Sequence, residues 1–332
     1  MKPKYLSNNP HIYLVAPSFG CTTSPYQERL DKALSNFKKL NINITLGDNC
    51  YKANGIASSN TPKLRALEFM TAYESNADAI MSVGGGETMV EMLEYIDFDK
   101  IKALPPKWFV GFSDNTNLTY TLTTICDVET IYGNNAPNFY NYPLEYDTLD
   151  TIRMLKGEKV FIGYPKWQLN ETKDVFPKYN FDQDKIITPV NYNSPFSGIL
   201  LGGCLDCLSI ICGTKFDKTK EYIQKHKNEG IIFYLEACEL TSIGIRRALF
   251  QLKAAGWFNY VKGFIIGRSL QYNDNSFGTT PIHSYIDILG DLNVPILLDC
   301  DLGHLSPSLP MRNGAIATVS YINNNIEIKY KD

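Results

Sequence analysis

The chain alternates short apolar segments with amphipathic ones, and this alternation restricts its possible folds more than any other feature. Apolar runs at 12–17, 42–46 and 77–83 are typical of buried strands, and apolar residues at helical spacing occupy 26–40 and 62–72 between them. Strands that alternate with helices at this spacing pair in parallel through crossover helices. The sequence therefore predicts an α/β fold with a mainly parallel, doubly wound sheet.

A second regular section begins near residue 195, and 332 residues exceed one typical hydrophobic core. Its predicted strands cover 197–203, 230–236, 261–266 and 294–299, followed by a terminal hairpin within 314–330. The intervening stretch is dense in Tyr, Asn, Pro and Lys and shows no clear period. We expect an N-terminal domain at 1–140, a connecting and substrate-facing segment at 141–193, and a C-terminal domain at 194–332.

The charge balance narrows the class of partner. Lys and Arg number 32 and Asp and Glu number 35, giving a net charge of −3, which lacks the basic surplus that nucleic-acid or anionic-membrane binding requires. We therefore expect a small-molecule partner. The N-terminal residues lack the apolar core of a signal peptide, and no apolar run reaches membrane-spanning length. These features predict a cytoplasmic protein.

The eight cysteines are scattered through apolar sequence, which is typical of reduced core cysteines in a cytosolic enzyme. Cys204 and Cys207 form a C-x-x-C pattern, but no second pair and no histidine pair follow at the spacing of a zinc site. We interpret the pattern as the turn of a strand-to-helix connection, with a metal or redox site as the alternative.

Residues 107–116 contain the candidate catalytic turn. An apolar strand pattern ends there and a helical pattern follows, so Ser113 lies where a hydroxyl projects from a tight turn. The N-terminus of the following helix would offer N–H groups to a developing oxyanion. Asn115 occupies the last position of G-x-S-x-G, so the motif is incomplete. The alternative is an ordinary helix N-cap formed by Ser113 and Asp114.

Three consecutive glycines, Gly84, Gly85 and Gly86, follow the predicted third strand. Glycines at the end of a strand allow close backbone approach and can present N–H groups to a negative atom. A dinucleotide site would instead place G-x-G-x-x-G after the first strand, where none occurs. The pattern favours a cradle for an oxyanion or a substrate carboxylate over a phosphate loop, and a simple tight turn remains the alternative.

A serine nucleophile needs a general base, and the chain contains four histidines: His11, His226, His283 and His304. Only His304 lies in a glycine-containing loop just after an apolar strand, where α/β proteins place catalytic side chains. A hydrogen-bonded loop residue without a catalytic role is the alternative.

The orienting acid should also lie at a strand end, as Glu236 does. Such an acid fixes the imidazole tautomer and stabilises the imidazolium that forms when the base accepts the serine proton. Three other acids compete for this role: Glu239, Asp299 and Asp301.

Two residues outside this set are candidates for substrate contact. Trp167 lies in the connecting segment and could stack on an aromatic or sugar group, the alternative being a half-exposed tryptophan between domains. Arg247 or Arg268 could pair with a free carboxylate, the alternative being a solvated surface arginine. We assign Trp167 and Arg247, with Gly84 and Gly86, to substrate binding.

Together these residues resemble the serine LD-carboxypeptidase family, which includes the microcin C immunity-type peptidases. The resemblance runs nearly end to end. It is carried by V-A-P-S at 15–18, V-G-G-G at 83–86, G-F-S-D-N-T at 111–116, G-G-C-L at 202–205, L-E at 235–236, I-R-R-A-L at 245–249 and G-H at 303–304.

This resemblance implies a flavodoxin-like N-terminal domain, a smaller β-rich C-terminal domain and a homodimer. It also implies a catalytic triad and a backbone oxyanion hole without any metal or organic cofactor. The implied triad is Ser113, Glu236 and His304, and the implied oxyanion hole consists of the N–H groups of Gly85 and Asp114.

Three positions depart from the family pattern and weaken the transfer of substrate specificity. Ala237 follows the acid where Asp is frequent, Cys204 stands where Asn is usual, and Glu87 follows the glycines in an unusual context. The resemblance implies amide hydrolysis, first of cytoplasmic muropeptides. The alternative substrate is a peptidyl or aminoacyl nucleotide analogue, and a non-catalytic ligand-binding protein is the alternative of another class.

Overall fold

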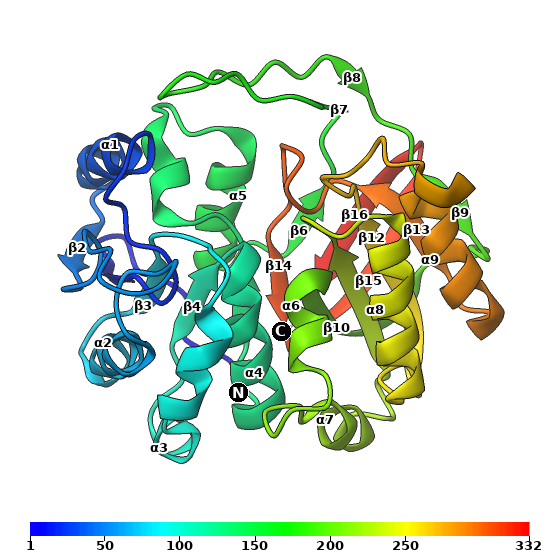
Figure 1. Cartoon of the computed structure of the whole chain (residues 1–332), viewed down its shortest axis with the longest axis horizontal. Coiled ribbons are helices and arrows are strands. Elements are labelled where there is room, and N and C mark those ends of the chain that lie inside the picture. The colour runs from blue at the N-terminus through cyan, green and yellow to red at the C-terminus, as the bar shows by residue number, and fades with distance from the viewer. Residues whose placement is uncertain (332) are drawn as a thin grey trace. The chain divides into compact units, whose positions relative to one another are not determined.

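The computed structural model describes residues 1–331 and divides them into two compact units (Figure 1). Unit 1 comprises Met1–Glu158 and Thr172–Lys178, and unit 2 comprises Lys159–Glu171 and the chain from Tyr179 onward. The units are similar in length, so the second one is not the smaller. Both are α/β structures with parallel strands, which confirms the predicted fold class.

Unit 1 is built on a parallel sheet. Its strands are β1 (His11–Val15), β2 (Asn43–Leu46), β3 (Ala79–Ser82), β4 (Trp108–Gly111) and β5 (Thr130–Tyr132). They lie in the order β5-β4-β3-β1-β2, which is the flavodoxin-like order. The order reverses direction between β1 and β3. The carboxyl ends of these two strands therefore border the crevice where doubly wound proteins bind ligands.

Helices lie on both sides of these strands (Figure 1). They are α1 (Tyr26–Lys39), α2 (Pro62–Glu74), α3 (Phe98–Ala103), α4 (Thr116–Cys126) and α5 (Tyr146–Leu155), with 3-10 turns η1 (Met89–Tyr95), η2 (Ser113–Asn115) and η3 (Ala136–Tyr140). Helix α1 buries Leu30, Ala33 and Phe37, the apolar face that the sequence predicts. Helix α2 begins at Pro62 as predicted, although the Thr61 side chain makes no capping bond.

The described part of unit 2 contains a sheet of eight strands in the order β6-β16-β15-β10-β11-β12-β13-β9. Strands β10 to β13 are parallel, whereas β9, β15, β16 and β6 pair antiparallel. The strands are β6 (Val160–Ile162), β9 (Thr188–Val190), β10 (Phe196–Cys204), β11 (Ile231–Glu236), β12 (Val261–Gly267), β13 (Ile296–Cys300), β15 (Ile316–Ile322) and β16 (Asn325–Tyr330). The predicted terminal hairpin is confirmed as β15 and β16.

Shorter elements complete unit 2. They are the strands β7 (Lys166–Trp167), β8 (Gln183–Asp184) and β14 (Met311–Asn313), the helices α6 (Leu205–Ile211), α7 (Thr219–Lys225), α8 (Ser242–Ala254) and α9 (Pro281–Leu289), and the turns η4 (Ser276–Gly278) and η5 (Gly290–Leu292). Helix α7 was not predicted from the sequence. Gly256 follows the end of α8 with a φ of 79°, the conformation that favours glycine at this position.

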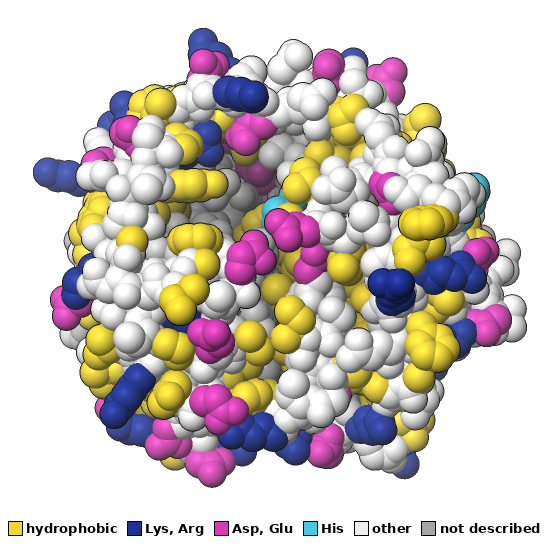
Figure 2. All heavy atoms as spheres, viewed as in Figure 1, with side chains coloured by type: hydrophobic (Ala, Val, Ile, Leu, Met, Phe, Trp, Pro, Cys, Tyr) yellow, Lys and Arg dark blue, Asp and Glu magenta, His cyan; other side chains and the backbone are white. Residues whose placement is uncertain are grey.

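The surface charges and the cysteines are distributed as the near-neutral net charge and the scattered cysteine positions of the sequence suggest. On the face in Figure 2, lysine and arginine side chains are interspersed with acidic ones and form no continuous basic patch. All eight cysteines are free thiols, and seven are buried. Within residues 1–331, no helix combines the length and the apolar character that crossing a membrane requires.

Candidate functional site

In unit 1, the predicted site residues gather at the carboxyl ends of β1, β3 and β4. Ser18 follows β1, the three glycines follow β3, and Ser113 follows β4. This edge is the crevice that the strand order defines. The sequence prediction placed the glycines and Ser113 at strand ends but could not show that these two strands are adjacent.

Ser113 adopts a left-handed backbone with a φ of 64°. Non-glycine residues seldom adopt this region, and strained serines of this kind form the strand-to-helix turn of nucleophile elbows. The Ser113 N–H donates to the hydroxyl of Tyr132 at 3.1 Å, which holds the turn against β5. Ser113 is not the N-cap of α4, because Asn115 occupies that position. The geometry therefore favours the elbow interpretation over the ordinary cap.

Gly85 lies directly against the serine side chain. A Cβ added at Gly85 would stand 3.0 Å from the Ser113 Cβ and 3.4 Å from its Oγ. Gly86 has a φ of 149°, and a Cβ there would come within 2.2 Å of the Ser18 hydroxyl. Only residues without side chains let this loop approach so closely. The glycine loop therefore lines the Ser113 site. A simple tight turn would not need glycines this close to the serine side chain.

Asn115, the residue that interrupts G-x-S-x-G, connects the two loops. Its Nδ2 donates to the carbonyl of Gly84 at 2.9 Å and to that of Phe112 at 2.8 Å. A Cβ at Gly111 would lie 2.6 Å from the Asn115 Cβ, so glycine is needed there for Asn115 to fit. Asn115, which stands where the motif has glycine, therefore holds the two loops together through its side-chain hydrogen bonds.

The Asp114 side chain points into the core of unit 1. Its Oδ2 accepts hydrogen bonds from the Ser18 hydroxyl at 2.5 Å and the Met89 N–H at 3.0 Å, and its Oδ1 accepts one from Asn117 at 2.8 Å. Burial raises the pKa of Asp114, although these hydrogen bonds oppose the shift. The carboxylate is therefore structural, and the predicted contribution of Asp114 to an oxyanion hole concerns its backbone N–H alone.

Unit 2 brings Glu236 and His304 together. Glu236 ends β11 and is fully buried, and its Oε2 lies 2.9 Å from Nδ1 of His304 in the loop after β13. Burial alone would lower the pKa of His304, but the adjacent Glu236 carboxylate, together with Cys238, raises it well above its usual value. A carboxylate on Nδ1 leaves Nε2 as the ring nitrogen that can exchange a proton with a nucleophile.

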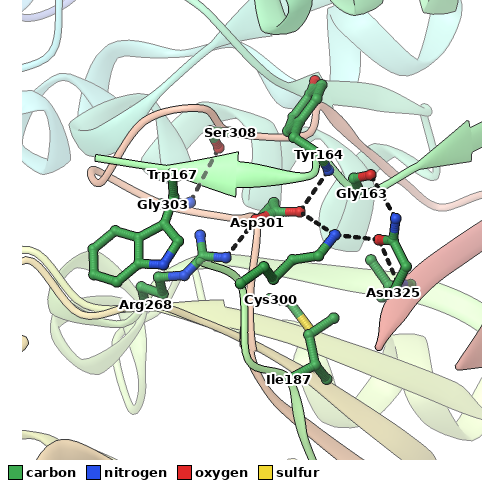
Figure 3. Close-up of polar contacts among 12 residues, drawn as sticks. Gly163, Tyr164, Trp167, Ile187, Arg268, Cys300, Asp301, Gly303, Ser308 and Asn325 are labelled. Atoms are coloured by element: carbon green, nitrogen blue, oxygen red, sulfur yellow. Dashed lines mark hydrogen bonds and ion pairs between the residues drawn. The ribbon is translucent and has the colours of Figure 1, made fainter. Parts of the chain in front are cut away.

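The other candidate acids and bases have different surroundings. Glu239 is exposed, and Asp301 forms a buried ion pair with Arg268 (Figure 3). Asp299 is mostly buried, and burial raises its pKa to about 6. Of the four acids, Glu236 is therefore the one that hydrogen-bonds to His304. Among the other histidines, His11 Nε2 is hydrogen-bonded to Thr45 at 2.8 Å and His283 is exposed.

Two glycines pack on Glu236: Gly303, which belongs to the Gly-His motif, and Gly267, which the sequence did not indicate as a site residue. A Cβ added at Gly303, which has a φ of 106°, would stand 2.9 Å from the Glu236 Cβ. At Gly267 an added Cβ would come within 3.0 Å of the same atom. Gly267 ends β12 and Gly303 precedes His304, so their lack of side chains lets both segments close around the acid. In the sequence, a glycine at or just after the end of each of two successive strands could have indicated this close packing.

Asp206, within the C-x-x-C pattern, fixes the loop that follows the acid. Its carboxylate accepts hydrogen bonds from the N–H groups of Cys238 at 3.0 Å, Glu239 at 2.9 Å and Leu240 at 3.2 Å. Cys204 ends β10 and α6 begins at the next residue, as the turn interpretation predicts. No group of three or more potential metal ligands occurs in the part of the chain that the structure describes.

The predicted substrate-contact residues of unit 2 lie in different environments. Trp167 is 4% exposed, with the Arg268 guanidinium 4.8 Å from its ring centre and Tyr272 at 5.0 Å, so the expectation of a half-exposed side chain is wrong (Figure 3). Arg268 and Tyr272, both in the loop that follows β12, pack against it. Arg268 is itself buried and already paired with Asp301. Arg247 is exposed on α8.

Comparison with protein families matches both halves of the chain. Residues 12–133 match the model of the LD-carboxypeptidase N-terminal domain, and residues 197–319 match that of the LD-carboxypeptidase C-terminal domain. These two matches cover more than half of the sequence.

Individual proteins similar to this chain share about a quarter of its residues or fewer. The microcin C7 self-immunity protein MccF of Escherichia coli is 26% identical over 287 residues, covering 81% of this chain and 79% of that protein. A protein of Treponema pallidum, named provisionally as a carboxypeptidase, is 23% identical over 328 residues, covering 96% and 92%. The solved structure of MccF in complex with aspartyl sulfamoyl adenosine has a TM-score of 0.85 at 21% identity, covering 100% of this chain and 99% of that one. This likeness shows a shared fold.

Proposed function

Because the chain belongs to the LD-carboxypeptidase family, we propose that it is a serine hydrolase that cleaves an amide bond in a small peptide-like substrate. The observation that carries the proposal is the strained Ser113 turn, with a φ of 64° and Gly85 packed against its side chain. A structural serine would gain nothing from this conformation, whereas a nucleophile gains an exposed hydroxyl beside backbone N–H groups.

In the proposed mechanism, His304 accepts the Ser113 proton as Ser113 attacks the carbonyl carbon. Glu236 stabilises the imidazolium that forms, as its 2.9 Å contact with Nδ1 allows. The N–H groups of Gly85 and Asp114 stabilise the oxyanion. His304 then protonates the leaving amine, and a water molecule that it activates releases the acyl group from Ser113.

Two substrate classes fit this chemistry. The first is a muropeptide, from which cleavage would release a terminal D-amino acid. The second is a peptidyl or aminoacyl nucleotide analogue, which is favoured by the similarity to MccF, because MccF has been solved with aspartyl sulfamoyl adenosine. Both substrates contain an amide or related acyl bond that a serine nucleophile can attack, so the chemistry alone does not separate them.

Product analysis by mass spectrometry tests the proposal. Wild-type protein and Ser113→Ala would be incubated with a muropeptide tetrapeptide and, separately, with aspartyl sulfamoyl adenosine. We expect turnover of one substrate by wild type, reduced by a factor of at least about 10³ in the variant. Release of D-alanine would assign the first class, and cleavage on the nucleotide side the second.

Labelling with a fluorophosphonate separates an enzyme from a binding protein. An activated serine reacts covalently with this probe, so wild type should be labelled at Ser113 and Ser113→Ala should not. Equal labelling of both proteins, or turnover that survives in Ser113→Ala, would exclude Ser113 as the nucleophile. Absence of labelling and of turnover would support a non-catalytic ligand-binding protein instead.

A further inference from the structure

A pocket in unit 2, at the ends of β12 and β13, has no part in the proposed hydrolysis. Helix α9 and the loop after β12 complete it. Its walls include the apolar residues Ile266, Pro281 and Leu298 and the polar residues Tyr272, Tyr285 and Asp299. Gly267 also lines it, so the pocket shares one residue with the environment of Glu236.

Two polar groups of this pocket are buried without a protein partner. Asp299 is 8% exposed, and its carboxylate forms no hydrogen bond with the described residues, although the nearby charge of Arg268, which is itself paired with Asp301, acts on it. Tyr285 is 1% exposed, and its hydroxyl likewise has no partner among them. Buried polar groups are almost always hydrogen-bonded, and an unpaired buried carboxylate is especially unfavourable. The two side chains are therefore available to hydrogen-bond a polar ligand that enters the pocket.

The backbone directs Asp299 into this position. The pairing of β12 with β13 is irregular here: Ile265 pairs with Leu297, and Gly267 pairs with Cys300. Strand β13 therefore contains one extra residue in this interval, which is a β-bulge. Asp299 has a φ of 59°, which is rare for a residue other than glycine. Bulges of this kind turn a side chain away from its regular direction and occur near functional sites. The strand is thus distorted where its unpaired carboxylate meets the pocket.

We propose that this pocket binds the ammonium group of a small primary amine. Asp299 would supply the counter-charge, and the hydroxyl oxygen of Tyr285 would accept a second N–H. The rings of Tyr272 and Tyr285 favour a cation, and Ile266, Pro281 and Leu298 suit a short aliphatic body. None of the described lining residues is Lys or Arg. The charge of Arg268 reaches Asp299 from outside the lining but is paired with Asp301, so the carboxylate of Asp299 gives the lining its preference for a cation over an anion.

This inference goes beyond the proposed hydrolysis, because binding requires neither Ser113 nor His304. Titration of the full-length protein with n-propylammonium chloride at pH 8, followed by calorimetry, tests it. Titration with n-propanol at matched ionic strength supplies the neutral control. We expect saturable binding of the amine, equal in wild type and Ser113→Ala, and affinity for n-propanol at least about tenfold lower.

The decisive variant is Asp299→Asn, which removes the charge and keeps the shape. Asn tolerates the left-handed backbone at this position, so the fold should survive. Affinity for n-propylammonium should fall by at least about tenfold. Tyr285→Phe, which keeps the ring and removes the hydroxyl, should also weaken binding and serves as a second measurement if Asp299→Asn does not fold.

Asp291→Asn is the matched control. Asp291 is an exposed acid shortly after α9, paired with Lys253 and outside the pocket, and its loss changes the net charge by the same amount. Its affinity for n-propylammonium should equal that of wild type. The proposal is overturned if wild type shows no saturable binding, if Asp299→Asn binds as tightly as wild type, or if Asp291→Asn loses affinity equally.

Discussion

Gly303 packs so closely on Glu236 that a Cβ added at Gly303 would lie 2.9 Å from both the Cβ and the Oε2 of the acid. The backbone of Gly303 has a φ of 106°, which side chains disfavour independently of space. Glycine at this position therefore lets the loop bearing His304 approach the acid that orients it. This contact links the local sequence Gly303-His304 to the geometry of the proposed base.

Gly303→Ala should consequently impair both stability and activity. The substitution combines an unfavourable φ with displacement of Glu236, so we expect the free energy of unfolding to fall by about 1–3 kcal/mol. The value of kcat/KM should fall by at least about tenfold, because the His304–Glu236 contact would be disturbed. Denaturant unfolding and steady-state kinetics measure the two effects.

Gly278→Ala provides the matched control, since Gly278 has a φ of 72° but no atom within 4 Å of an added Cβ. It should lose about 1 kcal/mol of stability through backbone strain and keep wild-type kcat/KM. If Gly303→Ala also retained wild-type kcat/KM, the packing of Gly303 on Glu236 would have no role in the reaction.

The His304–Glu236 pair predicts the pH dependence of the proposed reaction. His304 must be neutral to accept a proton, and its raised pKa keeps it protonated to a higher pH than an ordinary histidine. The value of kcat/KM should therefore rise with pH, with its midpoint above about 6.5. The stability that imidazolium formation contributes is fully present below about pH 6.5 and is lost as the pH rises through the folded-state pKa.

Glu236→Gln tests this assignment. The variant removes the charge that raises the pKa of His304, so the midpoint of the pH–rate profile should move to lower pH. The maximal kcat/KM should also fall, by a factor on the order of 10² to 10⁴, because the imidazolium loses its counter-charge. A profile with the wild-type midpoint would show that the titrating group is not His304.

The fold was largely predictable because long apolar segments and helical spacing are local signals. The central strands of both sheets and the helices α1 and α2 were predicted close to their observed ranges. Helix α7 was missed because its buried apolar residues, Tyr222 and Ile223, are adjacent and lie within a charged run, so they show no helical spacing. Strands of two or three residues, such as β7 and β8, are too short to show a period.

The candidate site was predictable only in part, for a related reason. Glu236 ends an apolar strand, and Ser113 and His304 follow one, positions that the sequence reveals. Asp206 contacts the loop after Glu236, and Gly267 contacts Glu236 itself. In both cases the partner is about 30 residues away in the chain. Such contacts leave no periodic pattern. The burial of Trp167 has the same origin, because Arg268 and Tyr272 are distant in sequence.

Asp301 is predicted to be essential for the stability of unit 2. Its buried carboxylate pairs with Arg268 and with Lys185 at 3.3 Å, and accepts the N–H of Tyr164 at 2.7 Å (Figure 3). Asp301→Asn would leave two buried cations without their counter-charge. We expect the free energy of unfolding, measured by urea denaturation, to fall by about 3–5 kcal/mol.

An exposed ion pair gives the comparison for this prediction. Asp99 pairs with Lys102 at 2.9 Å, and its side chain is 92% exposed. Asp99→Asn should change the free energy of unfolding by less than about 1 kcal/mol. A similarly small change for Asp301→Asn would mean that the buried cluster contributes no more than a surface pair.

The loop that follows Glu236 depends on Asp206, which accepts three backbone N–H groups through one carboxylate. Asp206→Ala would leave these donors without their acceptor, and we expect a loss of about 1–3 kcal/mol in the free energy of unfolding. Because Cys238, one of the three donors, also affects His304, the pH–rate midpoint should move as well. Glu239→Gln, an exposed change in the same loop, should leave both quantities unchanged. A shift in stability without any shift in the pH–rate midpoint would limit Asp206 to a purely structural role.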